Sequence, residues 1–120
     1  MNTFMENQAL EFSQPLLGFE GLKRWQLVAR PQHLPFMWLQ SVDDPEVALP
    51  LADPTMFVAG YRPAVPDWMG VGGRVFCVVT RREAGLGINL AAPLMVAHNG
   101  RAAQVVLDNP LYGTFHPLAA

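Results

Sequence analysis

The stretch PFMWLQSVDDPEVA at residues 35–48 is the most informative part of this chain, because it combines two apolar runs with a compact polar break between them. The first run ends in a cluster that contains Gln40, Ser41 and two aspartates, and Pro45 follows at once. Aromatic and β-branched residues bounded by Asp and Pro are typical of strands joined by a turn. The stretch therefore predicts a strand, a tight acidic turn and a returning strand.

Similar short apolar runs follow one another along the rest of the chain. Eleven prolines and ten glycines in 120 residues leave few uninterrupted windows that are long enough for a helix. We predict an all-β single domain over residues 1–120, a small antiparallel β-barrel or barrel-like sandwich with at most short helical turns. The predicted strands are residues 9–12, 25–29, 36–42, 47–51, 56–61, 74–80, 94–98 and 102–107.

Three segments carry more local detail. Asn99-Gly100 lies between two apolar runs and predicts a hairpin with a type I′ turn, which needs positive φ at both central residues. Residues 75–79 are apolar at every position, which indicates a strand covered on two sides, with Cys77 as a core residue. At residues 53–57 a helical turn capped by Asp53 competes with a strand, and we favour the strand. One shared core is expected from Phe36, Leu39, Val75, Phe76, Val78, Val105 and Leu107.

The composition excludes several classes of protein. Apolar residues make up 51% of the chain and charged residues 15%, whereas disordered chains combine low hydrophobicity with high net charge. The net charge of -2 disfavours direct binding of nucleic acid through its phosphates and leaves a basic protein partner open. The first nine residues do not resemble a signal peptide, and no apolar run is long enough to span a bilayer. We expect a cytoplasmic monomer that contacts no membrane.

The carboxylates raise the question of a metal or catalytic site. Four of them lie within eleven positions, yet the segment lacks the spacing and the bend glycine of a calcium loop. The simpler interpretation is that Asp44 and Asp53 cap the turns that precede prolines. The three histidines have no ligand-like spacing, and the glycines of residues 70–73 precede a strand rather than a helix. We therefore expect no metal, no cofactor and no catalytic residue.

Four blocks of residues occur in a fixed order over residues 10–118. They are Phe12, Pro15, Gly18 and Phe19; residues 35–48 with Asp53, Pro54, Phe57 and Tyr61; residues 89–94; and Gln104, Val106, Leu107, Tyr112, Pro117 and Leu118. Together these blocks resemble the FliW family of flagellar assembly factors. The chain differs from the family pattern at Ser13, where proline is usual, and at Pro15, where glycine is usual. Residues 68–75 are also short where many members carry a helical insert, so the chain resembles a shortened member.

The resemblance implies a non-enzymatic binding protein with flagellin and CsrA as its protein partners. In that family the two partners compete, and the free protein relieves CsrA repression of flagellin translation. Several residues of the blocks are polar or turn residues that a core does not need, and Trp68 is expected at an exposed rim. The partner-binding candidates are therefore Gln40, Ser41, Asp44, Trp68, Asn89, Leu90 and Pro93.

Two alternatives remain open at this point. Asp44 and Asn89 could serve only to satisfy the amides of their own loops, which is the structural interpretation of these side chains. A small β-barrel also hosts many unrelated functions, so the alternative function is a binding module for a small molecule or nucleic acid.

Overall fold

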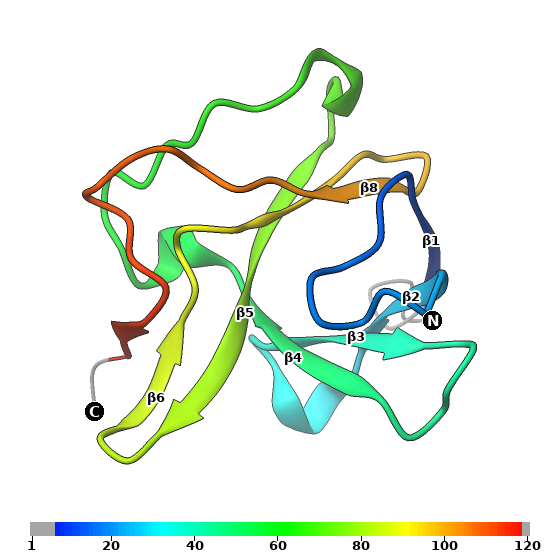
Figure 1. The fold of residues 1–120 in the computed structure, drawn as a ribbon, viewed down its shortest axis with the longest axis horizontal. Helices are drawn as coiled ribbons and strands as arrows, with labels where there is room; N and C mark the ends of the chain where they lie inside the picture. The colour runs from blue at the N-terminus through cyan, green and yellow to red at the C-terminus, as the bar shows by residue number, and fades with distance from the viewer. Residues whose placement is uncertain (1–6, 119–120) are drawn as a thin grey trace.

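The computed structural model describes residues 7–118 and shows an all-β domain (Figure 1). Its only helical segments within that range are 3-10 turns of three residues each, η2 Pro31–His33, η3 Pro54–Met56 and η4 Asp67–Met69. This confirms the predicted fold class. The strands are β1 Gln8–Phe12, β2 Arg24–Ala29, β3 Met37–Ser41, β4 Ala48–Ala52, β5 Arg74–Arg82, β6 Gly85–Ile88, β7 Leu94–Val96, β8 Arg101–Gln104 and β9 His116–Pro117.

Seven of the strands close into a barrel in the order β4-β3-β2-β1-β8-β7-β5, and β5 returns to β4. Six of the seven junctions are antiparallel. The seventh, between β1 and β8, is parallel, with Glu11 opposite Arg101 and Phe12 opposite Ala102, and is the one exception to the antiparallel pairing that the sequence predicts. Strands β6 and β9 extend from β5 outside the barrel.

Strand β5 separates two hydrophobic cores. Phe76 and Val78 point into the barrel, where they join the large buried side chains Trp25 and Leu39. Cys77 and its neighbours of the same parity lie on the opposite face, in a second cluster beneath the C-terminal segment. The strand is thus covered on two sides as predicted, but the prediction of one shared core is wrong, because successive side chains of a strand point to opposite faces. The second cluster also includes Phe36, Val75 and Leu107, and Val105 belongs to neither cluster.

The hairpin at Asn99-Gly100 is present, with a turn type that differs from the prediction. The Gly100 amide donates to the carbonyl of Ala97 at 3.0 Å, and the Ala97 amide donates to the carbonyl of Arg101 at 2.8 Å. Gly100 has φ +96°, whereas no residue other than glycine has positive φ in the described chain. The loop therefore contains one residue more than a type I′ turn, and only its last position needs the left-handed region.

Gly100 also seats the hairpin on β1. Its carbonyl accepts a hydrogen bond from the Glu11 amide at 2.9 Å, and a Cβ at this position would lie 2.6 Å from the Ala9 carbonyl oxygen. Only a glycine permits this approach of two backbones. The contact lies beside the parallel β1–β8 pairing that closes the barrel.

The predicted strand at residues 56–61 is wrong, and the helical turn that competed with it is present as η3. The Asp53 Oδ1 atom accepts hydrogen bonds from the Thr55 amide at 3.0 Å and the Thr55 hydroxyl at 2.7 Å, and Pro54 occupies the first helical position. A capped turn with proline in place outweighs the strand preference of the apolar residues that follow. Asp53 is thus the capping residue that the alternative described.

Candidate functional site

The polar residues at the end of β3 brace the β3–β4 turn from within. Ser41 is only 2% exposed, and its hydroxyl oxygen accepts a hydrogen bond from the Asp44 amide at 2.9 Å. The half-buried Gln40 donates from Nε2 to the carbonyls of Pro45 at 3.1 Å and Val47 at 3.0 Å. Both candidates therefore hold the shape of the turn, and the Ser41 side chain lies below the surface.

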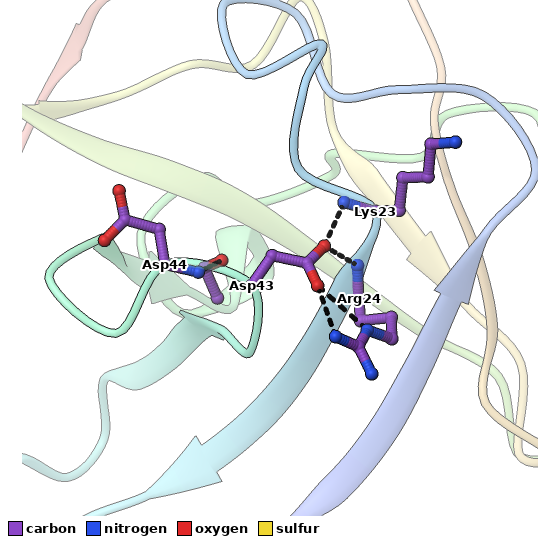
Figure 2. A network of polar contacts seen from close by, with 5 residues as sticks. Lys23, Arg24, Asp43 and Asp44 are labelled. Atoms are coloured by element: carbon purple, nitrogen blue, oxygen red, sulfur yellow. Dashed lines mark hydrogen bonds and ion pairs between the residues drawn. The ribbon is translucent and has the colours of Figure 1, made fainter.

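Asp43 ties this turn to the start of β2, as Figure 2 shows. Its Oδ2 atom accepts hydrogen bonds from the amides of Lys23 at 2.7 Å and Arg24 at 3.0 Å. Its Oδ1 atom accepts from the Arg24 guanidinium Nε at 2.8 Å and forms an ion pair with Nη2 at 2.8 Å. The Lys23 amide, the Arg24 amide and the Arg24 side chain lower the pKa of Asp43 from its ordinary 3.8 to about 2.

Asp44 points away from the Asp43 network in Figure 2. It is half-exposed, and its Oδ1 atom accepts a hydrogen bond from the Glu46 amide at 3.1 Å. This confirms that Asp44 caps its turn, as Asp53 does. One carboxylate oxygen makes this bond, so the side chain keeps the capacity to accept further hydrogen bonds.

The segment between β6 and β7 holds three further candidates. The half-exposed Asn89 accepts hydrogen bonds at Oδ1 from the amides of Ala91 at 3.0 Å and Ala92 at 3.2 Å. Leu90 is 3% exposed, and its carbonyl accepts a hydrogen bond from the Tyr61 hydroxyl at 2.7 Å. The ring of Pro93 is fully buried. Leu90 thus belongs to the second core and the Pro93 side chain lies below the surface, while Asn89 remains partly exposed.

Trp68 lies in η4 and is half-exposed, as predicted for a rim residue. The Arg101 guanidinium lies 4.6 Å from the centre of its ring, which is the geometry of a cation–π contact. Because Arg101 begins β8, this contact connects the short link before β5 to the hairpin that closes the barrel.

The candidates do not form one contiguous patch. Figure 1 shows the β3–β4 turn on the right of the barrel and the β6–β7 segment on its left. The side chains that remain accessible among the seven candidates are Gln40, Asp44, Trp68 and Asn89, all of them partly exposed. A partner that contacts all of them would have to extend around the barrel.

The ion pair between Asp43 and Arg24 could not be predicted from the sequence. In the sequence Asp43 is one of several clustered carboxylates, and the partner that holds it lies 19 positions earlier in the chain. No local spacing signals such a contact, because the pairing of β2 with β3 brings the two residues together.

Three features bear on metal binding, on thiol reactivity and on membrane insertion. Between residues 7 and 118, no group of three or more His, Cys, Asp or Glu side chains lies close enough to hold a metal ion. Cys77 is fully buried, and this burial raises the pKa of its thiol to about 12. None of the helical segments in the described part of the chain is long and apolar enough to cross a membrane.

Comparison with known proteins gives a consistent result. A family model described as "FliW protein" matches residues 2–118. The flagellar assembly factor FliW of Syntrophotalea carbinolica is 36% identical over 126 residues, covering 96% of this chain and 89% of the relative. The protein of the same name from Thermotoga neapolitana is 32% identical, covering 95% and 85% of the two chains. A crystal structure of the flagellar assembly factor FliW superposes with a TM-score of 0.81 at 24% identity, over 94% of this chain and 86% of that one.

Proposed function

This chain belongs to the FliW family of flagellar assembly factors, and we propose that it acts by binding flagellin and the translational regulator CsrA. Flagellin and CsrA compete for it in this proposal, so that the protein left free by flagellin removes CsrA from flagellin mRNA. The observation that carries the proposal is the family match over residues 2–118.

Two further observations support a binding role rather than catalysis. The relatives are named as assembly factors and not as enzymes. The net charge of -2 also favours a partner that presents a basic surface, as a protein that binds RNA does.

We assign the partner contacts to the accessible candidates, above all Asp44 and Asn89. Each uses one side-chain oxygen to cap its own loop. Asp44 keeps a second carboxylate oxygen as an acceptor, and Asn89 keeps its amide nitrogen as a donor. Each side chain can therefore cap its loop and contact a partner at the same time, so the two interpretations of these residues are not exclusive.

Isosteric variants separate capping from contact more sharply than alanine does. Asp44→Asn and Asn89→Asp each retain the capping oxygen, while the first removes a charge and the second removes the amide donor. Asp53→Asn is a matched control, because Asp53 has the same capping geometry at a different turn.

Binding of purified flagellin and purified CsrA to each variant is measured by calorimetry, together with the melting temperature. We expect Asp44→Asn or Asn89→Asp to weaken at least one partner about tenfold without lowering the melting temperature, and Asp53→Asn to bind normally. Unchanged affinities in both test variants would make these residues purely structural. Retardation of labelled RNA by the purified protein alone would favour the alternative function as a nucleic-acid-binding module.

A further inference from the structure

Strand β5 pairs with β4 at only two positions, although both strands continue past this short ladder. The two strands pair at Leu51 with Val78 and at Ala52 with Cys77, and the next residue of β4 is Pro50. Proline has no amide hydrogen to donate to a sheet ladder. Strand β5 continues to Arg82, and over residues 79–82 its partner is β6.

The free stretch of β5 is an open sheet edge. Figure 1 shows β4 and β6 on opposite sides of β5, and the Asn89 amide bonds to the Val78 carbonyl on the β6 side at 3.1 Å. No described strand pairs with the β4-facing edge beyond Val78. Because the backbone groups of successive strand residues face opposite sides, Thr80 and Arg82 share the β6 side with Val78. Val79 and Arg81 therefore direct their backbone donors and acceptors to the β4-facing edge, where another chain can add a strand.

A hollow of about 410 Å³ adjoins this edge, within the range of small-ligand pockets of about 300–1,000 Å³. Leu34 is 46% exposed and Leu86 is 43% exposed, so both belong to the exposed large hydrophobic residues of this protein. Their exposure beside an open edge indicates apolar surface that a partner could cover. The hollow is lined by Gln32, His33, Leu34, Phe36, Trp38, Pro50, Val79 and Leu86.

The Trp38 side chain, which lines the hollow, is fixed by contacts within the protein. The Trp38 indole Nε1 donates a hydrogen bond to His33 Nδ1 at 2.9 Å, and the two ring centres are 5.5 Å apart. The Arg30 guanidinium lies 4.9 Å from the centre of the Trp38 ring. A side chain fixed in this way loses little conformational entropy when it binds.

The charged side chains placed beside the hollow are arginines. None of the lining residues is a carboxylate, and the Arg30 guanidinium stacks on the Trp38 ring. Arg81 lies directly opposite Leu86 in the β5–β6 ladder and so shares its face. These two arginines can pair with carboxylates of a partner.

We propose that the edge of residues 79–82 and the adjoining hollow, together the β5 edge groove, bind an extended acidic segment of a partner protein. The segment adds as a strand to β5, places one large apolar side chain over Trp38 and pairs its carboxylates with Arg81 and Arg30. The open backbone edge favours a peptide over nucleic acid, because a base or phosphate does not extend a sheet ladder. This surface goes beyond the proposed function, since it contains none of the residues assigned to flagellin or CsrA.

A panel of ten-residue synthetic peptides tests the proposal. Each peptide alternates glutamate with valine and carries Phe, Leu or Trp at one central position. The full chain, labelled with ¹⁵N, is titrated with each peptide, and amide shifts are followed by NMR. We expect saturable shifts at residues 79–82 and at the Trp38 indole. Replacing every glutamate by lysine, or methylating the backbone nitrogens that face β5, should weaken binding at least tenfold.

Two matched pairs of variants complete the test. Arg81→Glu and Leu86→Lys alter the groove, whereas Arg62→Glu and Leu111→Lys make the same changes at exposed positions elsewhere. We expect about tenfold weaker binding in the first pair and unchanged binding in the second. The proposal is overturned if no peptide of the panel binds, or if the lysine or N-methylated peptides bind equally well. It is also overturned if oligouridine shifts the same amides instead. A second copy of the chain would be the occupant if sedimentation shows self-association that Arg81→Glu or Leu86→Lys abolishes, and this too would overturn the proposal.

Discussion

Replacing Gly100 by alanine should loosen the closure of the barrel. A side chain at φ +96° lies in the region that L-residues rarely adopt, which costs about 1–2 kcal/mol. The new Cβ would also lie 2.6 Å from the Ala9 carbonyl oxygen, a backbone atom that can move only if β1 moves. Displacing β1 weakens the hydrogen bond from Glu11 to Gly100, worth about 1 kcal/mol. We therefore expect Gly100→Ala to lower the free energy of unfolding by about 2–3 kcal/mol.

Two other glycines separate these contributions. Gly18 has φ +88°, and a Cβ added there would have no neighbouring atom within 4 Å, so Gly18→Ala should cost only the backbone penalty of about 1–2 kcal/mol. Gly21 has an ordinary φ and equally open surroundings, so Gly21→Ala should be neutral or stabilising by up to about 1 kcal/mol.

The three variants are compared by urea unfolding, followed by tryptophan fluorescence, with a common slope against urea concentration. The order of stability should be Gly21→Ala, then Gly18→Ala, then Gly100→Ala. If Gly100→Ala is no less stable than Gly18→Ala, the hairpin is not seated on β1 as described, and the explanation of the parallel β1–β8 junction fails.

Three further predictions concern the cores and the acidic turn. Phe76→Ala should lower the free energy of unfolding by about 3–5 kcal/mol, because the ring is buried inside the barrel, and an unchanged urea midpoint would contradict this. Cys77 should resist alkylation by iodoacetamide at pH 8 until the protein unfolds, and rapid modification of the native protein, read by mass spectrometry, would contradict its burial. Asp43→Asn should destabilise the protein near neutral pH, because a pKa lowered to about 2 means stabilisation that is present above pH 4 and lost as the pH falls towards 2. The difference from the unmodified protein should therefore shrink below pH 4 and disappear as the pH falls through 2. A pH-independent difference in melting temperature would contradict the role of the ionised carboxylate.

Local sequence signals predicted the elements that depend on neighbouring residues. The acidic stretch of residues 35–48 forms β3, its turn and β4, and Asn99-Gly100 forms a hairpin. The apolar β5 lies between two cores because each face meets different partners. In each of these cases the pattern of apolar residues and turn formers suffices.

Features that depend on contacts distant in the chain could not be predicted in this way. The parallel β1–β8 junction rests on the approach of Gly100 to Ala9, about ninety positions apart in the chain. Strand β6 contains two glycines and β9 only two residues, so neither has the composition of a strand. The candidate residues Ser41, Leu90 and Pro93 are buried, and their residue types do not reveal this. Ser41, for example, uses its hydroxyl to accept a hydrogen bond from the Asp44 amide within its own turn.

We propose that this member of the FliW family binds flagellin and CsrA, and one titration separates that role from others. CsrA is titrated calorimetrically into the purified protein, alone and after saturation with flagellin. We expect each partner to bind the protein alone and flagellin to abolish or strongly weaken the binding of CsrA. The absence of binding by both partners at concentrations that saturate an established FliW protein would contradict it.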